Sequence, residues 1–336
     1  MIREAIARLV EGEDLPASAM AEVMDEIMGG EATPSQVAAF ATALRMKGET
    51  VEELAAAAER VRARAVKLGG GRSGIVIDTC GTGGDASGTF NISTAVAFVV
   101  SGAGIHVAKH GNRAVSSRAG SADVLEALGV GIDLSPERAR ACLDEVGICF
   151  LFAPSYHASM KHAAVPRREI GLRTFFNLLG PLANPAGASR QLLGVYSEGL
   201  TETMVGVLNR LGSEAAWVVW GEGGLDEVTT TGRTRVAELS EGNIRSFDLS
   251  PDDFGLARSR LEDLRGGDAK ENARILREIL SGREGPRRDI VLANAAAALL
   301  VAGRAKDLKQ GVDLASAAID RGESLKRLES LIQMTA

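Results

Sequence analysis

Apolar residues recur at every third or fourth position through the first 67 residues of the chain. This spacing places them on one face of an α-helix, and it is present in IREAIARLV (2–10), SAMAEVMDEIM (18–28) and VAAFATALRMK (37–47). The stretch TPSQ (33–36) marks a helix start, because threonine can cap a helix, proline suits its first position and glutamine completes a capping box. We therefore predict that residues 1–67 form a helical domain.

From Ile75 onward, short apolar runs of strand length alternate with helical stretches. This alternation is typical of parallel strands joined by helices, so we predict an α/β domain over residues 74–336 with a central, mostly parallel sheet flanked by helices. Residues 234–247 are expected to form an antiparallel pair, and Ser121 and Ser135 are expected to cap helices. The predicted strands are IVID (75–78), IHVAK (105–109), ICFLFA (148–153), LLGVYS (192–197) and AAWVVWG (215–221).

The charge balance, the cysteines and the apolar runs argue against some classes of function and location. The chain has 38 basic and 44 acidic residues, a net charge of −6, and no run of lysine and arginine, which disfavours nucleic-acid binding. Its three cysteines lack the CxxC spacing of metal sites and indicate reduced thiols, so we expect a cytoplasmic protein. The first residues do not resemble a signal peptide, and the apolar run 293–303 is too short to cross a bilayer, so no membrane contact is expected.

Small residues crowd the stretch DTCGTGGDASGTFNISTA (78–95), which lies between a predicted strand and a predicted helix. Phosphates bind at such places in α/β proteins, because backbone N–H groups point beyond the end of the strand and glycine lets the backbone approach. The Walker pattern GxxxxGK[ST] is absent. Residues 81–86 fit the dinucleotide pattern GxGxxA only weakly, because the next strand ends in Lys109 where an acidic residue is expected. An ordinary glycine-rich turn is the alternative.

Two further polar clusters follow predicted strands. In the loop after the second strand, cations and hydroxyl groups suit a highly charged anion. Its members are Lys109, His110, Asn112, Arg113, Ser116, Ser117, Arg118 and Ser121. After the fifth strand, Asp226 and Glu227 stand together in a Gly/Thr loop where both can reach Mg²⁺, which takes carboxylate and phosphate oxygens. One of Arg167, Arg168 and Arg173 can hold a substrate carboxylate. The alternative for each cluster is a solvated, charged surface.

Together these clusters indicate an enzyme that holds a Mg²⁺-bound, phosphorylated substrate beside a carboxylated partner. No arrangement of serine, histidine or cysteine suggests a covalent nucleophile, and we assign no general base.

The motifs resemble, in order and in sequence, those of the anthranilate phosphoribosyltransferases. They are GTGGD (81–85), NIST (91–94), KHGNRAVSS (109–117), GSADVLEALG (120–129), RREIGLRTFFNLLGPLANPA (167–186) and the Asp226-Glu227 pair. The resemblance spans essentially the whole chain. It implies transfer of the phosphoribosyl group of 5-phosphoribosyl 1-pyrophosphate (PRPP) to the amino group of anthranilate, giving N-(5-phosphoribosyl)anthranilate and pyrophosphate, the second step of tryptophan biosynthesis.

The resemblance also implies which residues bind each ligand. The residues implied for Mg²⁺, with two ions per active site, are Ser93, Asp226 and Glu227. Those implied for anthranilate are Gly81, Asn112 and Arg167. Those implied for PRPP are Gly81, Gly84, Asp85, Thr89, Asn91, Ile92, Ser93, Thr94, Lys109, His110, Gly111, Asn112, Arg113, Ala114, Val115, Ser116, Ser117 and Ser121.

For the fold, the resemblance implies a small all-helical domain, joined by part of about 155–188, beside the larger α/β domain, and a homodimer. Three other functions stay open at this point. A pyrimidine nucleoside phosphorylase would share the fold but carry a different lysine-serine phosphate pattern. A nucleic-acid-binding relative without enzymatic activity would be basic and would have lost Asn112 and Arg167. A dinucleotide-binding oxidoreductase is disfavoured by the weak fingerprint.

Overall fold

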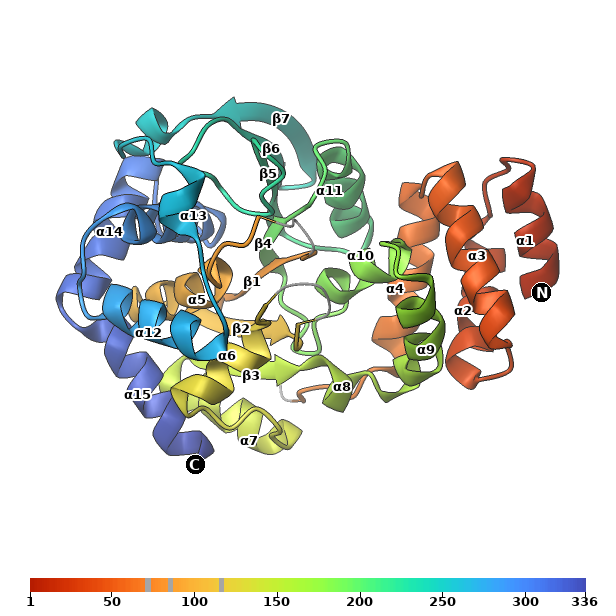
Figure 1. Ribbon diagram of the computed structural model, residues 1–336, viewed down its shortest axis with the longest axis horizontal. Helices are drawn as coiled ribbons and strands as arrows, with labels where there is room; N and C mark the ends of the chain where they lie inside the picture. Colours follow the sequence, from red (N-terminus) through yellow and green to blue (C-terminus); the bar gives the residue numbers. More distant parts are fainter. Residues whose placement is uncertain (70–73, 84–86, 115–117) are drawn as a thin grey trace.

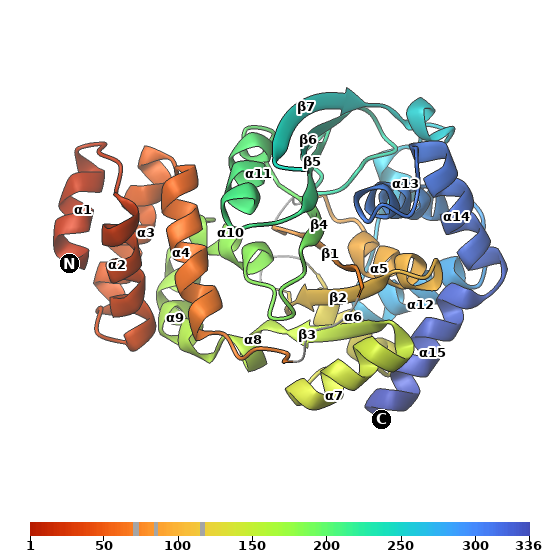
Figure 2. The ribbon, with the colours of Figure 1, turned by 180° about the vertical axis from the view of Figure 1, so that it is seen from behind.

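The computed structural model describes the chain except for residues 70–73, 84–86 and 115–117 (Figure 1). The first four helices lie together at one end of the molecule, and the sheet with its flanking helices fills the rest (Figures 1 and 2). Within the described residues, no helix combines the length and the apolar character needed to cross a membrane.

The N-terminal part is entirely helical, as predicted. The predicted capping box is present, because Gln36 N donates to Thr33 Oγ1 at 3.3 Å and Thr33 N donates to Gln36 Oε1 at 2.9 Å. A second box, formed by Thr50 and Glu53, starts the fourth helix. These local bonds fix where the helices begin. The helices are α1 (Ile2–Val10), α2 (Ala17–Gly29), α3 (Pro34–Lys47) and α4 (Val51–Arg64).

Seven strands form one sheet in the order β3-β2-β1-β4-β5-β6-β7. The first five in this order are parallel, whereas β6 and β7 are antiparallel, which confirms the predicted sheet and its antiparallel pair. β1 continues past the predicted end of IVID, because Thr79, Cys80 and Gly81 still pair with β4. The strands are β1 (Val76–Gly81), β2 (His106–Gly111), β3 (Ile148–Phe152), β4 (Arg190–Gly194), β5 (Ala215–Gly221), β6 (Thr234–Ser240) and β7 (Asn243–Leu249).

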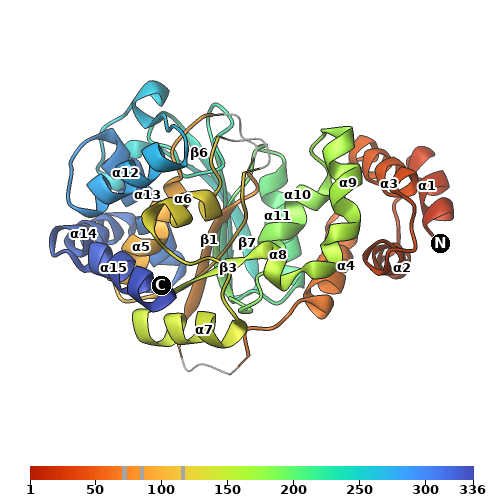
Figure 3. The same ribbon diagram turned by 60° about the horizontal axis from the view of Figure 1, so that its bottom comes forward.

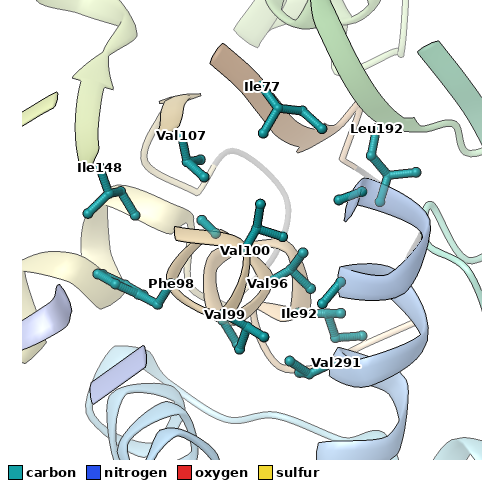
Figure 4. Close-up of a cluster of buried hydrophobic side chains, with 14 of the residues drawn as sticks. Ile77, Ile92, Val96, Phe98, Val99, Val100, Val107, Ile148, Leu192 and Val291 are labelled. Carbon is teal, nitrogen blue, oxygen red and sulfur yellow. The ribbon is translucent and has the colours of Figure 1, made fainter. Parts of the chain in front are cut away.

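One face of the sheet is covered by α5 and the C-terminal helices (Figure 3). α5 is apolar on nearly every side because the sheet and other helices surround it. In this core, side chains from four strands meet those of α5 and α13 (Figure 4), including Ile77, Val107, Ile148, Leu192, Val96, Val100 and Val291. The helices of this side are α5 (Ile92–Gly102), α6 (Ser121–Leu128), α7 (Pro136–Ala141, continued by a π turn, Cys142–Val146), α12 (Ala269–Leu280), α13 (Pro286–Val301), α14 (Leu308–Asp320) and α15 (Glu323–Thr335).

The other face of the sheet packs against a second group of helices, which also contacts the N-terminal bundle. α9 contacts α2 and α3, and α10 contacts α3 and α4. Phe40 of α3 meets Phe175 of α10 edge-on, with ring centroids 5.7 Å apart. The segment expected to leave the sheet thus lies against the N-terminal helices, but the same core includes Val218 of β5, so the domain limits stay predictions. The helices of this second group are α8 (Ala153–Tyr156), α9 (Lys161–Ile170), α10 (Phe175–Leu182) and α11 (Leu200–Arg210). Elsewhere and between these elements the described chain forms short 3₁₀ turns at Ala158–Met160, Pro251–Phe254 and Leu261–Leu264.

The prediction that Ser121 caps the helix that follows it is wrong. α6 begins at Ser121 itself, and Gly120 is its N-cap. The carboxylate of Asp123 accepts the N–H groups of Gly120 (2.8 Å) and Ala114 (2.9 Å). The acid in the first turn thus accepts the N–H groups of the N-cap residue and of Ala114, while the hydroxyl of Ser121 donates to Asn112 O. Ser135 does cap α7, as predicted.

Candidate functional site

The carboxyl ends of β1 and β4 lie side by side and carry part of the candidate site. Gly81 pairs with Gly194 across the two strands, and Thr82 N donates to Gly194 O at 2.9 Å. The loop after β5 lies directly on both glycines. A Cβ on Gly81 would be 2.3 Å from Asp226 Oδ2, and one on Gly194 would be 1.5 Å from Asp226 O. Both positions therefore require glycine, because any side chain would displace Asp226.

The adjacent carboxylates of Asp226 and Glu227 reach two different elements. Asp226 Oδ2 accepts the backbone N–H of Gly83 at 2.8 Å, and Glu227 Oε1 accepts that of Ser93 at 3.1 Å. Ser93 is the second residue of α5, so Glu227 also faces the positive end of the helix dipole. The acidic pair thus lies between the glycine loop and the start of α5. The sequence predicted this meeting, since both loops follow parallel strands of one sheet.

A buried lysine supports this arrangement from within the sheet. Lys109 of β2 is only 3% exposed, and its Nζ donates to Thr79 O at 2.6 Å and to Ser93 Oγ at 3.2 Å. Burial lowers the pKa of Lys109, while the carboxylates of Asp78 and Glu227 act in the opposite direction. Lys109 therefore fixes the Ser93 hydroxyl and places a cationic group close to the acidic pair.

A buried carboxylate, that of Asp78 in β1, joins β1 and β2 to the segment after α10. Burial raises the pKa of Asp78 to about 6, although Lys109 favours its charged form. Its Oδ2 accepts from Asn184 Nδ2 at 2.8 Å and its Oδ1 from His110 N at 3.3 Å. Asn184 Nδ2 also donates to Ala108 O at 2.8 Å. This network sets the relative positions of β1, β2 and the end of α10.

The side chain of His110 contacts α10. Its Nδ1 is 3.0 Å from Gly180 O, and its ring centroid is 5.0 Å from that of His157. Burial lowers the pKa of His110 to about 3, so the imidazole is neutral at physiological pH. Its Nε2 forms no hydrogen bond with the residues that the structure describes.

Arg167 lies in the last turn of α9 and is half-buried. Its guanidinium carbon is 5.4 Å from the centre of the Phe176 ring, and burial lowers its pKa. No acidic side chain in the described part of the chain forms an ion pair with it. Phe176 and Gly180 are one turn apart on α10, so Arg167 and His110 contact neighbouring turns of the same helix. A guanidinium in this position can hold a carboxylate through two parallel hydrogen bonds.

The other candidate arginines have different surroundings from those of Arg167. The guanidinium of Arg113 pairs with Asp123 (3.1 Å) and Glu126 (2.9 Å), and these carboxylates of α6, Glu126 most of all, raise its pKa. Arg168 is exposed, and Arg173 lies over an aromatic ring at 4.9 Å. Among the candidate arginines, therefore, Arg167 of α9 is the one whose guanidinium packs against α10.

Hydrogen bonds join the described residues at the two ends of the segment between β2 and α6. Ser121 Oγ donates to Asn112 O at 3.3 Å, and Asn112 Oδ1 accepts the N–H of Arg113 at 2.7 Å. A Cβ on Gly111 would be 2.3 Å from Ser121 Oγ, so this approach of the two ends requires glycine there.

Several of the other residues implied for PRPP lie around the start of α5. The side chain of Asn91 accepts from Asn272 Nδ2 at 2.8 Å, and Thr89 lies in the loop before α5. Ile92 and Thr94 are each 1% exposed, so their side chains lie in the core and only their backbone can border the site. Five further predictions lie outside the described residues, namely Gly84, Asp85, Val115, Ser116 and Ser117.

The oxygen atoms around the acidic pair fit Mg²⁺. They are the carboxylates of Asp226 and Glu227 and the hydroxyl of Ser93, and Mg²⁺ is usually held by one or two carboxylates together with substrate phosphates. The described residues contain no group of three His, Cys, Asp or Glu side chains that could hold a metal ion.

Sequence reasoning missed Gly194, Asn184 and Asn272. Gly194 stands inside an apolar run that predicts an ordinary strand, and its need for glycine arises only from the β5 loop that lies on it. Asn272 is 181 residues from the Asn91 side chain that it holds, so no local spacing could reveal it. Asn184 belongs to the LANPA stretch, where its position before proline suggests only a turn.

The chain matches two family models over most of its length. Residues 73–325 match the glycosyl transferase family a/b domain, and residues 3–65 match the helical bundle domain of the same family. Anthranilate phosphoribosyltransferase of Moorella thermoacetica is 56% identical over 332 residues, covering 99% of this chain and 98% of the relative. The enzyme of the same name from Geobacter sp. (strain M21) is 53% identical, covering 100% and 99%.

Solved structures agree with these sequence relatives. The crystal structure of anthranilate phosphoribosyltransferase from Thermus thermophilus superposes with a TM-score of 0.93 at 43% identity, covering 98% of this chain and 99% of that one. Anthranilate phosphoribosyltransferase from Saccharomyces cerevisiae, in complex with PRPP and Mg, gives a TM-score of 0.90 at 30% identity, covering 99% and 97%. A further structure of the yeast enzyme, in complex with 4-fluoroanthranilate, gives 0.89 at 28% identity and the same coverage.

Proposed function

Because the chain belongs to the anthranilate phosphoribosyltransferase family, we propose a role for each described site residue in the reaction of that family. The enzyme transfers the phosphoribosyl group of PRPP to the amino group of anthranilate in tryptophan biosynthesis. One observation carries the site assignment: Asp226 and Glu227 contact the backbone of Gly83 in the glycine loop and of Ser93 at the start of α5, both more than a hundred residues away in the sequence.

The first role is stabilisation of the departing pyrophosphate. Negative charge grows on this group as its bond to the ribose breaks, and the backbone N–H groups of the glycine loop and the buried Lys109 support it there. Mg²⁺ bound by Asp226, Glu227 and Ser93 supplies charge neutralisation. Without a cation, the two carboxylates would repel the pyrophosphate. The divergence of Asp226 and Glu227 toward two elements supports two ions per site.

The second role is the orientation of anthranilate. We assign its carboxylate to Arg167, whose guanidinium has an aromatic ring and no acidic side chain beside it among the described residues. We also assign Gly81 and Asn112, at the carboxyl ends of β1 and β2, to the anthranilate site. The aromatic amine is already neutral at pH 7, so it needs alignment with the ribose rather than a general base.

The third part of the proposal concerns assembly as a homodimer. Five of the eight large hydrophobic side chains that are exposed among the described residues lie on α1, α3 and α9 or directly beside them: Met1, Val10, Met46, Val165 and Leu172. α3 contacts both α1 and α9, so these helices are neighbours at one end of the molecule (Figure 1). Apolar side chains gathered on a surface favour contact with another subunit. The three free, buried cysteines support a cytoplasmic location.

An activity assay tests the proposed function. The protein should consume anthranilate, seen as a loss of its fluorescence, only when PRPP and Mg²⁺ are both present. The same preparation should not cleave a pyrimidine nucleoside with phosphate, which would be the activity of the main enzymatic alternative. Persistent anthranilate fluorescence, or nucleoside cleavage, would contradict the proposal.

A further inference from the structure

The apolar helix α13 contains one fully buried amide, that of Asn294. It interrupts the run VLANAAAALL, and both Asn294 and the alanines on either side of it have no exposed surface. A buried amide is unfavourable unless its donors and acceptor are all bonded. Asn294 is bonded in full, and two of its three bonds leave its own helix.

The amide of Asn294 binds both backbone polar groups of Val228, its N–H and its C=O. Val228 N donates to Asn294 Oδ1 at 2.9 Å, and Asn294 Nδ2 donates to Val228 O at 2.8 Å. Asn294 Nδ2 also donates to Ile290 O, one turn earlier in α13, at 2.9 Å. These bonds fix the orientation of the amide, because exchanging its oxygen and nitrogen would place the oxygen against two carbonyl oxygens and the NH2 group against the N–H of Val228.

Val228 is the residue directly after Glu227. Its backbone groups lie in the interior, where an unpaired N–H or C=O costs free energy, and its side chain is fully buried. The peptide that follows the acidic pair is therefore held in one position relative to α13. Asp226, the first residue of the pair, packs directly against Gly81 and Gly194. The two carboxylates are thus fixed at both ends of a short segment.

The same helix also packs against the element that carries the third oxygen donor. Val291 of α13 lies beside Ile92, the first residue of α5, in the core shown in Figure 4. Ser93 is the next residue of α5. α13 therefore sets the distance between the segment of Asp226 and Glu227 and the start of α5.

We propose that Asn294 is a positioning residue for the Mg²⁺ site: its amide fixes the backbone after Glu227 and so holds the carboxylates at the spacing that the metal and the pyrophosphate need. The inference rests on the proposed function, since it assumes that Asp226 and Glu227 bind Mg²⁺. Residues that orient metal ligands commonly change metal affinity by about ten- to a hundredfold when they are replaced.

The main variant is Asn294→Leu, which keeps the branched shape of the side chain, is bulkier, and removes all three hydrogen bonds. Turnover is measured against Mg²⁺ concentration, together with the KM for anthranilate and the melting temperature. The half-saturating Mg²⁺ concentration should rise by about ten- to a hundredfold, while the KM for anthranilate stays close to the wild-type value. The matched control is Ser101→Ala, which removes a buried hydrogen bond from Ser101 Oγ to Gly147 O (3.1 Å), far along α5 from the site. The control should lower the melting temperature and leave the Mg²⁺ curve unchanged.

A second variant keeps the inference testable if Asn294→Leu does not fold. In Asn294→Asp, the neutral acid can accept from Val228 N and donate to Val228 O, whereas the carboxylate cannot donate. Burial raises the pKa of such a carboxyl, so the variant should approach the wild-type Mg²⁺ requirement as the pH falls and depart from it as the pH rises.

Three results separate the possible failures. An unchanged half-saturating Mg²⁺ concentration in Asn294→Leu, with a lower melting temperature like that of Ser101→Ala, overturns the inference. A Mg²⁺ requirement in Asn294→Asp that does not depend on pH also overturns it. If Asp226→Asn/Glu227→Gln keeps the wild-type Mg²⁺ curve, the proposed metal site itself is wrong, and the inference falls with it.

Discussion

The backbone N–H of Gly83 donates a 2.8 Å hydrogen bond to Oδ2 of Asp226, 143 residues further along the chain. This bond joins the loop after β1 to the loop after β5, across β4, which lies between these strands in the sheet. The glycine loop and the acidic pair therefore form one site, and a change on either side should affect the same ligand.

Gly194→Ala should damage this site without touching a charged group. The added Cβ would lie 1.5 Å from Asp226 O, so the β5 loop must move. Overpacking of this kind costs about 1–3 kcal/mol in the free energy of unfolding, and turnover should fall with it. Urea unfolding and the anthranilate assay measure both effects. Gly199→Ala is the control, because a Cβ there meets no atom within 4 Å. Wild-type turnover in Gly194→Ala would show that the position of the loop is unimportant.

Arg167→Ala should weaken the binding of anthranilate far more than that of PRPP. Removing a charge-assisted bond to a carboxylate costs about 1.5–3 kcal/mol, or roughly one to two decades in the KM for anthranilate. Arg168→Ala removes an exposed neighbouring arginine and should change neither constant. Steady-state kinetics with each substrate varied in turn decide the matter. Equal effects on both substrates, or an equal effect in the control, would refute the assignment.

The buried His110 should make the protein less stable in acid. Its pKa is lowered to about 3, whereas an unfolded histidine titrates near 6.5. Below about pH 6.5 the unfolded chain binds a proton that the folded protein does not, so stability is lost as the pH falls from about 6.5 toward 3. The loss is about 1.4 kcal/mol per pH unit for this group.

The comparison with His110→Phe isolates this effect, because contributions from other groups, including Asp78 with its raised pKa, largely cancel. The free energy of unfolding of the variant, relative to wild type, should be constant above about pH 6.5 and should rise as the pH falls below it. Urea unfolding across the pH range measures the difference. A constant difference down to pH 4 would mean that His110 takes up a proton in the folded protein.

Met46→Lys should convert a homodimer into monomers. Met46 is 84% exposed on α3, and a lysine on each subunit would place two charges in the apolar contact that we propose. Sedimentation velocity measures whether each protein is a dimer or a monomer. Ile244→Lys is the control, because Ile244 is 44% exposed but lies on β7. A wild-type protein that sediments as a monomer, or a Met46→Lys variant that stays dimeric, would count against the proposed surface.

Much of the fold and the location of the site could be predicted from the sequence. Apolar periodicity revealed the helices and the parallel strands. Because parallel strands end at the same edge of the sheet, the loops that carry Gly83 and Asp226 could be expected to meet. Long-range contacts could not be predicted in this way. The partners of Arg113 lie ten and thirteen residues away across a loop, and the role of its guanidinium at the phosphates stays a prediction. The Ser121 cap was wrong for a similar reason, because Gly120 is the N-cap and the Ser121 hydroxyl donates to Asn112 O, nine residues away.

The Mg²⁺ dependence of turnover in Asp226→Asn/Glu227→Gln tests the central claim most directly. The amide oxygens can still accept from Gly83 N and Ser93 N, so the loops keep their contacts while both negative charges are lost. Metal stabilisation of a leaving group contributes several kcal/mol, so turnover at ordinary Mg²⁺ should fall by several decades and should recover only in part at high Mg²⁺. PRPP should bind equally well or slightly more tightly without metal, because a repulsion has been removed. A variant with the wild-type Mg²⁺ curve and a lower melting temperature would contradict the account and leave the acidic pair a structural role alone.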